Sequence, residues 1–171
     1  MLIESRQQQV LCDTKWQLFN KRTWLFRYIP FIEGVFGSGS LALGNVNENS
    51  DFDVLILAKT GRIFSARFFS AVAFSLFGWR RKKLDHRISA KNKVCLNHFV
   101  TKASYHLTLP PSAYWQALYK QLVPLYGSEE KINEFFKANA DWLGGVKYQA
   151  DLRHKAKVPS RFKIAIEFLL S

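Results

Sequence analysis

Residues 37–57 read GSGSLALGNVNENSDFDVLIL, and this stretch decides the fold. Its last part belongs to an apolar run over 51–58, ended by Thr60 and Gly61, and we predict a β-strand there. Side chains alternate along a strand, so Asp51 and Asp53 are expected on one face and Phe52 on the other. Burying an unpaired carboxylate is unfavourable. The acid pair therefore indicates either a solvated strand end or a site for a cation.

The residues before the acid pair have the composition of a ligand-binding turn. The run over 31–36 predicts a short strand, 40–44 one or two helical turns closed by Gly44, and 45–50 a loop. Small residues over 37–40 let backbone N–H groups approach a ligand, and a helix start adds unpaired donors suited to a phosphate. Two adjacent carboxylates repel each other, and a hard divalent cation relieves that repulsion. Together these features predict a site for a metal-bound nucleoside triphosphate.

This combination resembles the signature of the DNA-polymerase-beta-like nucleotidyltransferase superfamily, in its small single-domain prokaryotic form. Gly39-Ser40 is followed by ten residues (41–50) and then by Asp-hydrophobic-Asp, as in that signature. The resemblance covers 31–58 directly and extends through the next helix and strand to 101. It implies a transferase that moves a nucleoside monophosphate from the triphosphate onto an acceptor hydroxyl and releases pyrophosphate. Two Mg²⁺ ions would assist this transfer.

The resemblance also assigns roles to particular residues. It makes Asp51 and Asp53 the catalytic, metal-holding pair, and it gives the triphosphate to Gly39 and Ser40. Because the sequence GSGS repeats, Gly37 and Ser38 are a second possible phosphate contact.

A departure from the superfamily pattern leaves two functions open. Active members carry a third carboxylate on a later strand, but the strand predicted over 93–101, KVCLNHFVT, contains no acid. Asn97 lies near the expected place, and Asp85 is the nearest acid upstream. The alternative to a transferase is therefore a non-catalytic module of the same fold that binds nucleotide or nucleic acid.

The charge of the chain favours an anionic partner. Lys and Arg exceed Asp and Glu by 25 to 13, giving a net charge of +12, and many of the cations fall within 80–93. This basic segment could attract a nucleic acid or another acceptor. The apolar window 63–79 is interrupted by Arg67 and is too short to span a bilayer, although the adjacent RRKK over 80–83 leaves a membrane-surface role open.

Two widely separated cysteines, Cys12 and Cys95, and a polar N-terminus indicate a reducing, cytoplasmic setting.

The order of elements predicts an α+β fold with a mixed sheet. We expect a nucleotidyltransferase-like domain over 1–108 and a C-terminal helical section over 109–171, packed on the same domain. The runs 31–36, 51–58 and 94–100 should share one sheet, covered by helices over 11–29 and 62–79. The second of these helices is expected to turn Phe68, Val72 and Leu76 toward the sheet.

Overall fold

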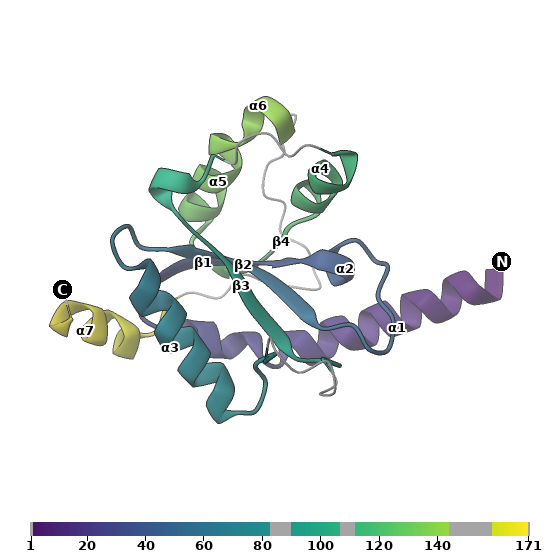
Figure 1. Cartoon of the computed structure of the whole chain (residues 1–171), viewed down its shortest axis with the longest axis horizontal. Helices are drawn as coiled ribbons and strands as arrows, with labels where there is room; N and C mark the ends of the chain where they lie inside the picture. Colours follow the sequence, from purple (N-terminus) through teal and green to yellow (C-terminus); the bar gives the residue numbers. More distant parts are fainter. Residues whose placement is uncertain (1, 83–89, 107–111, 144–158, 171) are drawn as a thin grey trace.

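The computed structural model describes residues 2–82, 90–106, 112–143 and 159–170. They form an α+β fold around a four-stranded mixed sheet with the strand order β3-β2-β1-β4 (Figure 1). The strands are β1 (Ile32–Ser38), β2 (Phe52–Ala58), β3 (Val94–Thr101) and β4 (Val123–Gly127). The helices are α1 (Leu2–Asn20), α2 (Gly39–Ala42), α3 (Ile63–Leu76), α4 (Ala113–Lys120), α5 (Glu129–Ala138), α6 (Ala140–Leu143) and α7 (Arg161–Leu169). Short 3₁₀ turns lie at Thr23–Arg27 (η1) and Lys102–Ser104 (η2).

The pairing of the strands fixes where the acid pair lies. β1 runs antiparallel to both β2 and β4, whereas β2 and β3 are parallel and are joined through α3. Asp53 is therefore opposite Ser38 on one neighbouring strand and opposite Cys95 on the other. The acid pair therefore lies at one end of an inner strand of the sheet, the end that is next to the start of α2.

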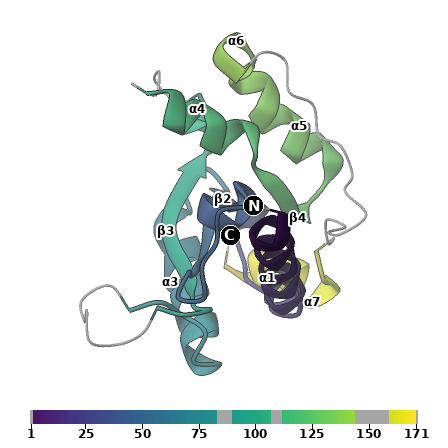
Figure 2. The same ribbon diagram turned by 90° about the vertical axis from the view of Figure 1, so that its right-hand side faces the viewer.

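Helices cover both faces of the sheet. Figure 2 shows α1, α3 and α7 on one side of the strands and α4, α5 and α6 on the other. The first layer encloses a core that includes Phe19, Phe26, Phe52 and Phe74, and the second encloses a core that includes Phe36, Tyr105, Phe135 and Phe136. Both faces of β2 are thus buried, which explains its continuous apolar run after Asp53.

The three strands predicted from the sequence are confirmed and share one sheet, but β4 was not predicted. β4 lies within 109–171, the section expected to be helical. Its sequence contains Pro124, which lacks an N–H group and is tolerated chiefly on edge strands. β4 is such an edge strand, with β1 as its neighbour in the sheet. The C-terminal section therefore completes the sheet as well as covering it.

Two helix predictions need correction. The helix expected over 11–29 begins earlier, at Leu2, and ends at Asn20, before the separate turn η1 and well ahead of Pro30. The helix α3 is present, but the prediction of its inward face is wrong. Ala66, Ser70 and Phe74 are buried, while the residues expected inside, Phe68, Val72 and Leu76, are exposed. A helix that is apolar all round gives no periodic signal for its buried side.

The last helix, α7, is anchored by a buried lysine. The Lys163 ammonium donates to the Tyr126 hydroxyl at 2.8 Å and to the Ile32 carbonyl, and it lies 3.5 Å from the Glu167 carboxylate. Ser160 caps the start of the helix by accepting a hydrogen bond from the Lys163 backbone N–H. α7 is therefore tied to β1 and β4. Across the described ranges, no helix is both long enough and apolar enough to cross a membrane.

Candidate metal and phosphate site

Asp51 and Asp53 converge with a cysteine at the end of the sheet. One ligand atom each from Asp51, Asp53 and Cys95 can be chosen so that all three lie within 4.8 Å of one another. Asp51 immediately precedes β2, and Asp53 is the second residue of that strand. Side chains alternate along a strand, so both carboxylates lie on one face, as predicted. Burial, and next the charge of Asp51, raise the pKa of Asp53. The smaller of these two effects is the repulsion between neighbouring carboxylates, which a cation would relieve.

The backbone at Gly39 approaches the acid pair more closely than a residue with a side chain could. Its φ of +68° lies in the left-handed region, which favours glycine. A Cβ atom added at Gly39 would lie 2.1 Å from Oδ2 of Asp53, far inside van der Waals contact. The start of α2 is thereby pressed against the Asp53 carboxylate. The Gly39–Ser40 turn and the acid pair form one continuous site.

The four residues of the repeated Gly-Ser sequence lie in two elements: Gly37 and Ser38 end β1, and Gly39 and Ser40 begin α2. Gly37 lies inside β1, where an added Cβ would meet the Trp16 ring at 3.0 Å, so close packing explains this glycine. Ser38 precedes α2 and its side chain makes no capping hydrogen bond. Gly39 and Ser40 open the single turn of α2, where the first N–H groups of a helix have no acceptor within the helix. The phosphate-binding role of all four residues stays a prediction.

Cys95 occupies the position on β3 directly opposite Asp53. Its thiol donates a hydrogen bond to Asp53 and accepts one from the Asn97 amide, with Nδ2 of Asn97 2.9 Å from Sγ. Burial, reinforced by the charge of Asp53, raises the pKa of the Cys95 thiol to about 12. The thiol therefore stays protonated at neutral pH and orients Asp53 through its hydrogen bond. No role in the site was predicted for Cys95, although the strand–helix–strand order over 51–101, which favours parallel neighbours, could have indicated one.

The structure describes only one of the two candidates for a third ligand. Asn97 lies beside the site on the same face of β3 as Cys95, with its amide engaged by the thiol. Asp85 falls in 83–89, outside the described residues. Among the described residues, the place expected for a third carboxylate next to Asp51 and Asp53 is thus occupied by the Cys95 thiol, with the Asn97 amide beside it.

Arg81 supplies a positive charge to the acid pair. Its Nη1 atom donates to Oδ2 of Asp51 at a distance of 2.6 Å, and this ion pair raises the pKa of Arg81. Arg81 also lines a cavity of about 320 Å³ together with other basic residues, among them Arg80, Lys82 and Lys93. Arg81 therefore links the acid pair to a basic cavity that belongs to the segment 80–93.

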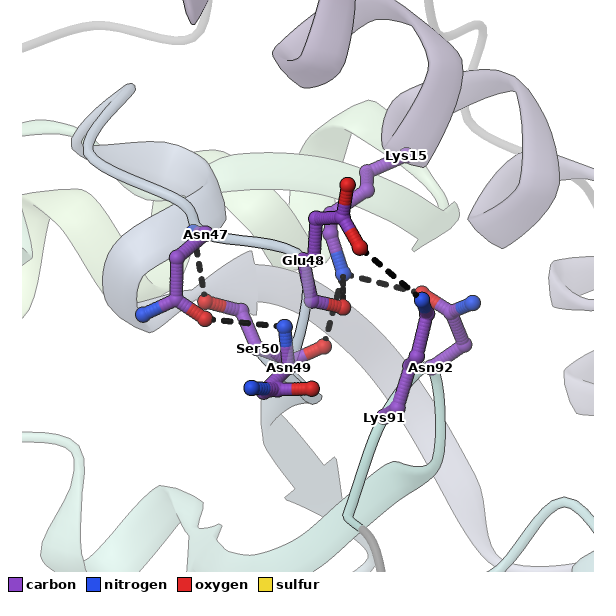
Figure 3. Close-up of polar contacts among 7 residues, drawn as sticks. All are labelled: Lys15, Asn47, Glu48, Asn49, Ser50, Lys91 and Asn92. Carbon is purple, nitrogen blue, oxygen red and sulfur yellow. Dashed lines mark hydrogen bonds and ion pairs between the residues drawn. The ribbon is translucent and has the colours of Figure 1, made fainter.

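The loop between α2 and the acid pair is held by the buried Lys15 of α1 (Figure 3). The Lys15 ammonium donates to the carbonyl oxygens of Glu48 and Ser50 at 3.0 and 2.9 Å and to Oδ1 of Asn92 at 2.9 Å. Its three donors thus find three acceptors, which compensates for burying the charge. Burial lowers the pKa of Lys15. This contact was not predicted, although a lysine among the apolar positions of the first helix could have indicated it.

Further contacts fix the same loop. Gln8 of α1 donates to the carbonyl oxygens of Gly44 and Val46 at 3.0 and 2.8 Å. Inside the loop, the Asn47 side chain accepts from the Asn49 N–H, and the Ser50 hydroxyl accepts from the Asn47 N–H (Figure 3). The loop therefore delivers Asp51 to the site from a defined backbone.

Comparisons with protein-family models, with curated proteins and with solved structures found no match to this chain.

Proposed function

We propose that this chain is a metal-dependent nucleotidyltransferase. The observation that carries the proposal is the contact between the Gly39–Ser40 turn and Asp53, with Asp51 on the same face. A turn that can receive phosphates and a pair of carboxylates that can hold Mg²⁺ meet at one place. Both groups are needed to bind a nucleoside triphosphate together with its metal.

The donor set fits Mg²⁺ through its oxygen atoms. Asp51 and Asp53 supply hard carboxylate ligands, and the protonated thiol of Cys95 serves as a hydrogen-bond donor to Asp53. When bound, divalent ions would stabilise charge on the attacking and leaving oxygens. In this reaction the acceptor hydroxyl gives up its proton to solvent and its oxygen bonds to the α-phosphorus, while the bond from that phosphorus to the oxygen bridging the α- and β-phosphates breaks and pyrophosphate leaves with the electron pair.

Arg81 would assist binding of the triphosphate. Its ion pair with Asp51 supplies the positive charge that a divalent ion would bring. With Asp51 engaged as a metal ligand, the guanidinium of Arg81 would be able to contact phosphate oxygens, for which it is well suited. The neighbouring Lys93 and Arg80 would extend this positive field toward an anionic acceptor.

A second candidate function is a non-catalytic module that binds the metal–nucleotide complex. Cys95 favours it, because the strand position opposite Asp53 holds a thiol and the described part of the site offers no third carboxylate. Binding requires one metal and two acids, whereas transfer also requires activation of the acceptor.

The test combines thermal unfolding with a transfer assay. Each of the four common nucleoside triphosphates is added with Mg²⁺, and the melting temperature and the release of pyrophosphate are measured. We expect one nucleotide to raise the melting temperature, since a ligand that binds only the folded state stabilises it. The variant Asp51→Asn/Asp53→Asn should lose this shift. Stabilisation without transfer or pyrophosphate release would favour the binding module, and no shift with any nucleotide would reject both functions.

A further inference from the structure

The solvent-facing side of α3 is an apolar stripe. Phe64, Phe68, Val72 and Leu76 are spaced four residues apart and expose 80%, 62%, 41% and 80% of their surface. The helix has a single charged residue, Arg67, which is exposed and whose guanidinium lies 5.3 Å from the centroid of the Phe99 ring of β3. An exposed helix face normally carries polar and charged residues. A continuous apolar face of this kind marks an interaction surface.

A cluster of exposed aromatic rings continues the stripe at the C-terminal end of α3. The ring centroid of Phe77 lies 5.7 Å from Trp24 and 4.8 Å from Trp79, and Trp24 in turn lies 5.8 Å from Tyr28. Trp24, Tyr28 and Phe77 are all exposed. Tryptophan and tyrosine combine an apolar ring with a polar atom, so they favour the boundary between water and a bilayer.

Beyond the aromatic cluster the surface becomes cationic. The basic cavity begins at Ser75 and Gly78, at the end of α3, and is bordered by the cationic side chains Arg80, Arg81, Lys82 and Lys93. Along one direction the surface therefore changes from apolar to aromatic to basic. A helix that lies on an anionic bilayer uses both kinds of residue, because its apolar side chains enter the acyl boundary and the cations beside it contact the headgroups.

We propose that this face of the protein docks on an anionic membrane surface. The α3 stripe would enter the boundary of the acyl chains, Trp24 and Tyr28 would lie at the interface, and Arg80 and Lys82 would contact lipid headgroups. The cations Arg80 and Lys82 next to the end of the stripe favour an anionic bilayer over a protein partner, because such a bilayer binds an apolar helix face and adjacent basic residues together. The helix lies on the membrane in this arrangement and does not cross it.

Co-sedimentation with vesicles tests the proposal on the full chain. The probes are vesicles of phosphatidylcholine alone and vesicles that also contain phosphatidylserine, without nucleotide. We expect binding to the phosphatidylserine vesicles that weakens with added salt. The variant Phe64→Ser/Phe68→Ser should weaken this binding by at least about tenfold, because two large apolar side chains no longer enter the lipid.

Two further variants separate the apolar and the charged contributions. Arg80→Gln/Lys82→Gln should reduce binding to the anionic vesicles. Tyr114→Ser, which removes an exposed aromatic ring on α4, should bind like the parent. Circular dichroism melting checks that each variant is folded, as expected for substitutions at exposed positions.

Three results would overturn the proposal. The first is no binding of the parent to the anionic vesicles, and the second is equal weakening by Tyr114→Ser. The third is a dimer in sedimentation velocity that Phe64→Ser/Phe68→Ser dissociates, since a second copy of the chain would then cover the stripe.

Discussion

Position 39 has no room for a Cβ atom, because that atom would lie 2.1 Å from Oδ2 of Asp53. The glycine that opens α2 and the carboxylate on β2 are therefore fitted to each other. Any ligand that contacts the turn is also next to the acid pair, so the two halves of the candidate site act as one.

We predict that Gly39→Ala destabilises the fold more than Gly61→Ala does. Both glycines have positive φ values, +68° and +76°, so both variants strain the backbone by about 1 kcal/mol. Only Gly39→Ala also adds a collision with Asp53, whereas an added Cβ at Gly61 meets nothing within 4 Å. Urea unfolding should show an extra loss of at least about 1 kcal/mol for Gly39→Ala. Equal losses would contradict the contact.

Replacement of Lys15 should destabilise the protein substantially. Lys15→Met leaves two carbonyl oxygens and an amide oxygen without their donor, with an expected loss of roughly 1–3 kcal/mol in the free energy of unfolding. The matched control is Lys91→Met in the same cluster, which removes an exposed ion pair with Glu48 and should cost about 0–1 kcal/mol. A Lys15→Met variant as stable as the control would show that the loop does not depend on this contact.

The two buried tyrosines Tyr105 and Tyr126 should respond oppositely to loss of the hydroxyl group. Of the buried side-chain atoms in the described ranges, the Tyr105 hydroxyl oxygen has no hydrogen-bond partner, whereas the Tyr126 hydroxyl accepts from Lys163 at 2.8 Å. Tyr105→Phe should keep its ring contact with Phe135 and leave stability unchanged or higher. Tyr126→Phe should lose about 1.5–3 kcal/mol, because a charged donor loses its acceptor. Thermal unfolding of both variants decides the matter, and a clear loss in Tyr105→Phe would be inconsistent with an unpaired hydroxyl.

His98 should make the fold sensitive to mild acid. Burial lowers the pKa of His98 below its ordinary value, and its ring packs against Tyr119. As the pH falls through about 6.5, the unfolded chain takes up a proton that the folded chain does not, so the free energy of unfolding falls. His98→Gln should reduce the difference in unfolding free energy between pH about 7.5 and about 5.5. If this difference in unfolding free energy is the same in the parent and in His98→Gln, the acid sensitivity comes from other groups.

The sequence predicted the centre of the fold well because its signals there are local. The apolar run after Asp53, the loop over 45–50 and the small residues around Gly39 each determine their own backbone conformation. The placement of both carboxylates on one face followed from strand alternation alone. These features depend on neighbours in sequence, which a single chain displays directly.

The parts that were not predicted depend on contacts between distant residues. The thiol of Cys95 enters the site through the parallel pairing of β2 with β3, and Lys15 reaches the loop from a helix far earlier in the chain. The inward face of α3 could not be read because apolar residues occur on every side of that helix. β4 was not predicted because it contains Pro124, and proline weakens the sequence signal of a strand.

The position of β4 has a consequence for the order of events during synthesis. β1 lies inside the sheet, yet its outer neighbour is β4, which comes from a much later part of the chain. Until residues 123–127 leave the ribosome, one edge of β1 has no β-strand partner from this sheet. An unpaired edge can join a strand of another chain. The nascent protein should therefore be most vulnerable to aggregation just before Val123–Gly127 emerges, and a chain that stops short of β4 should aggregate even though it contains every residue of the candidate site.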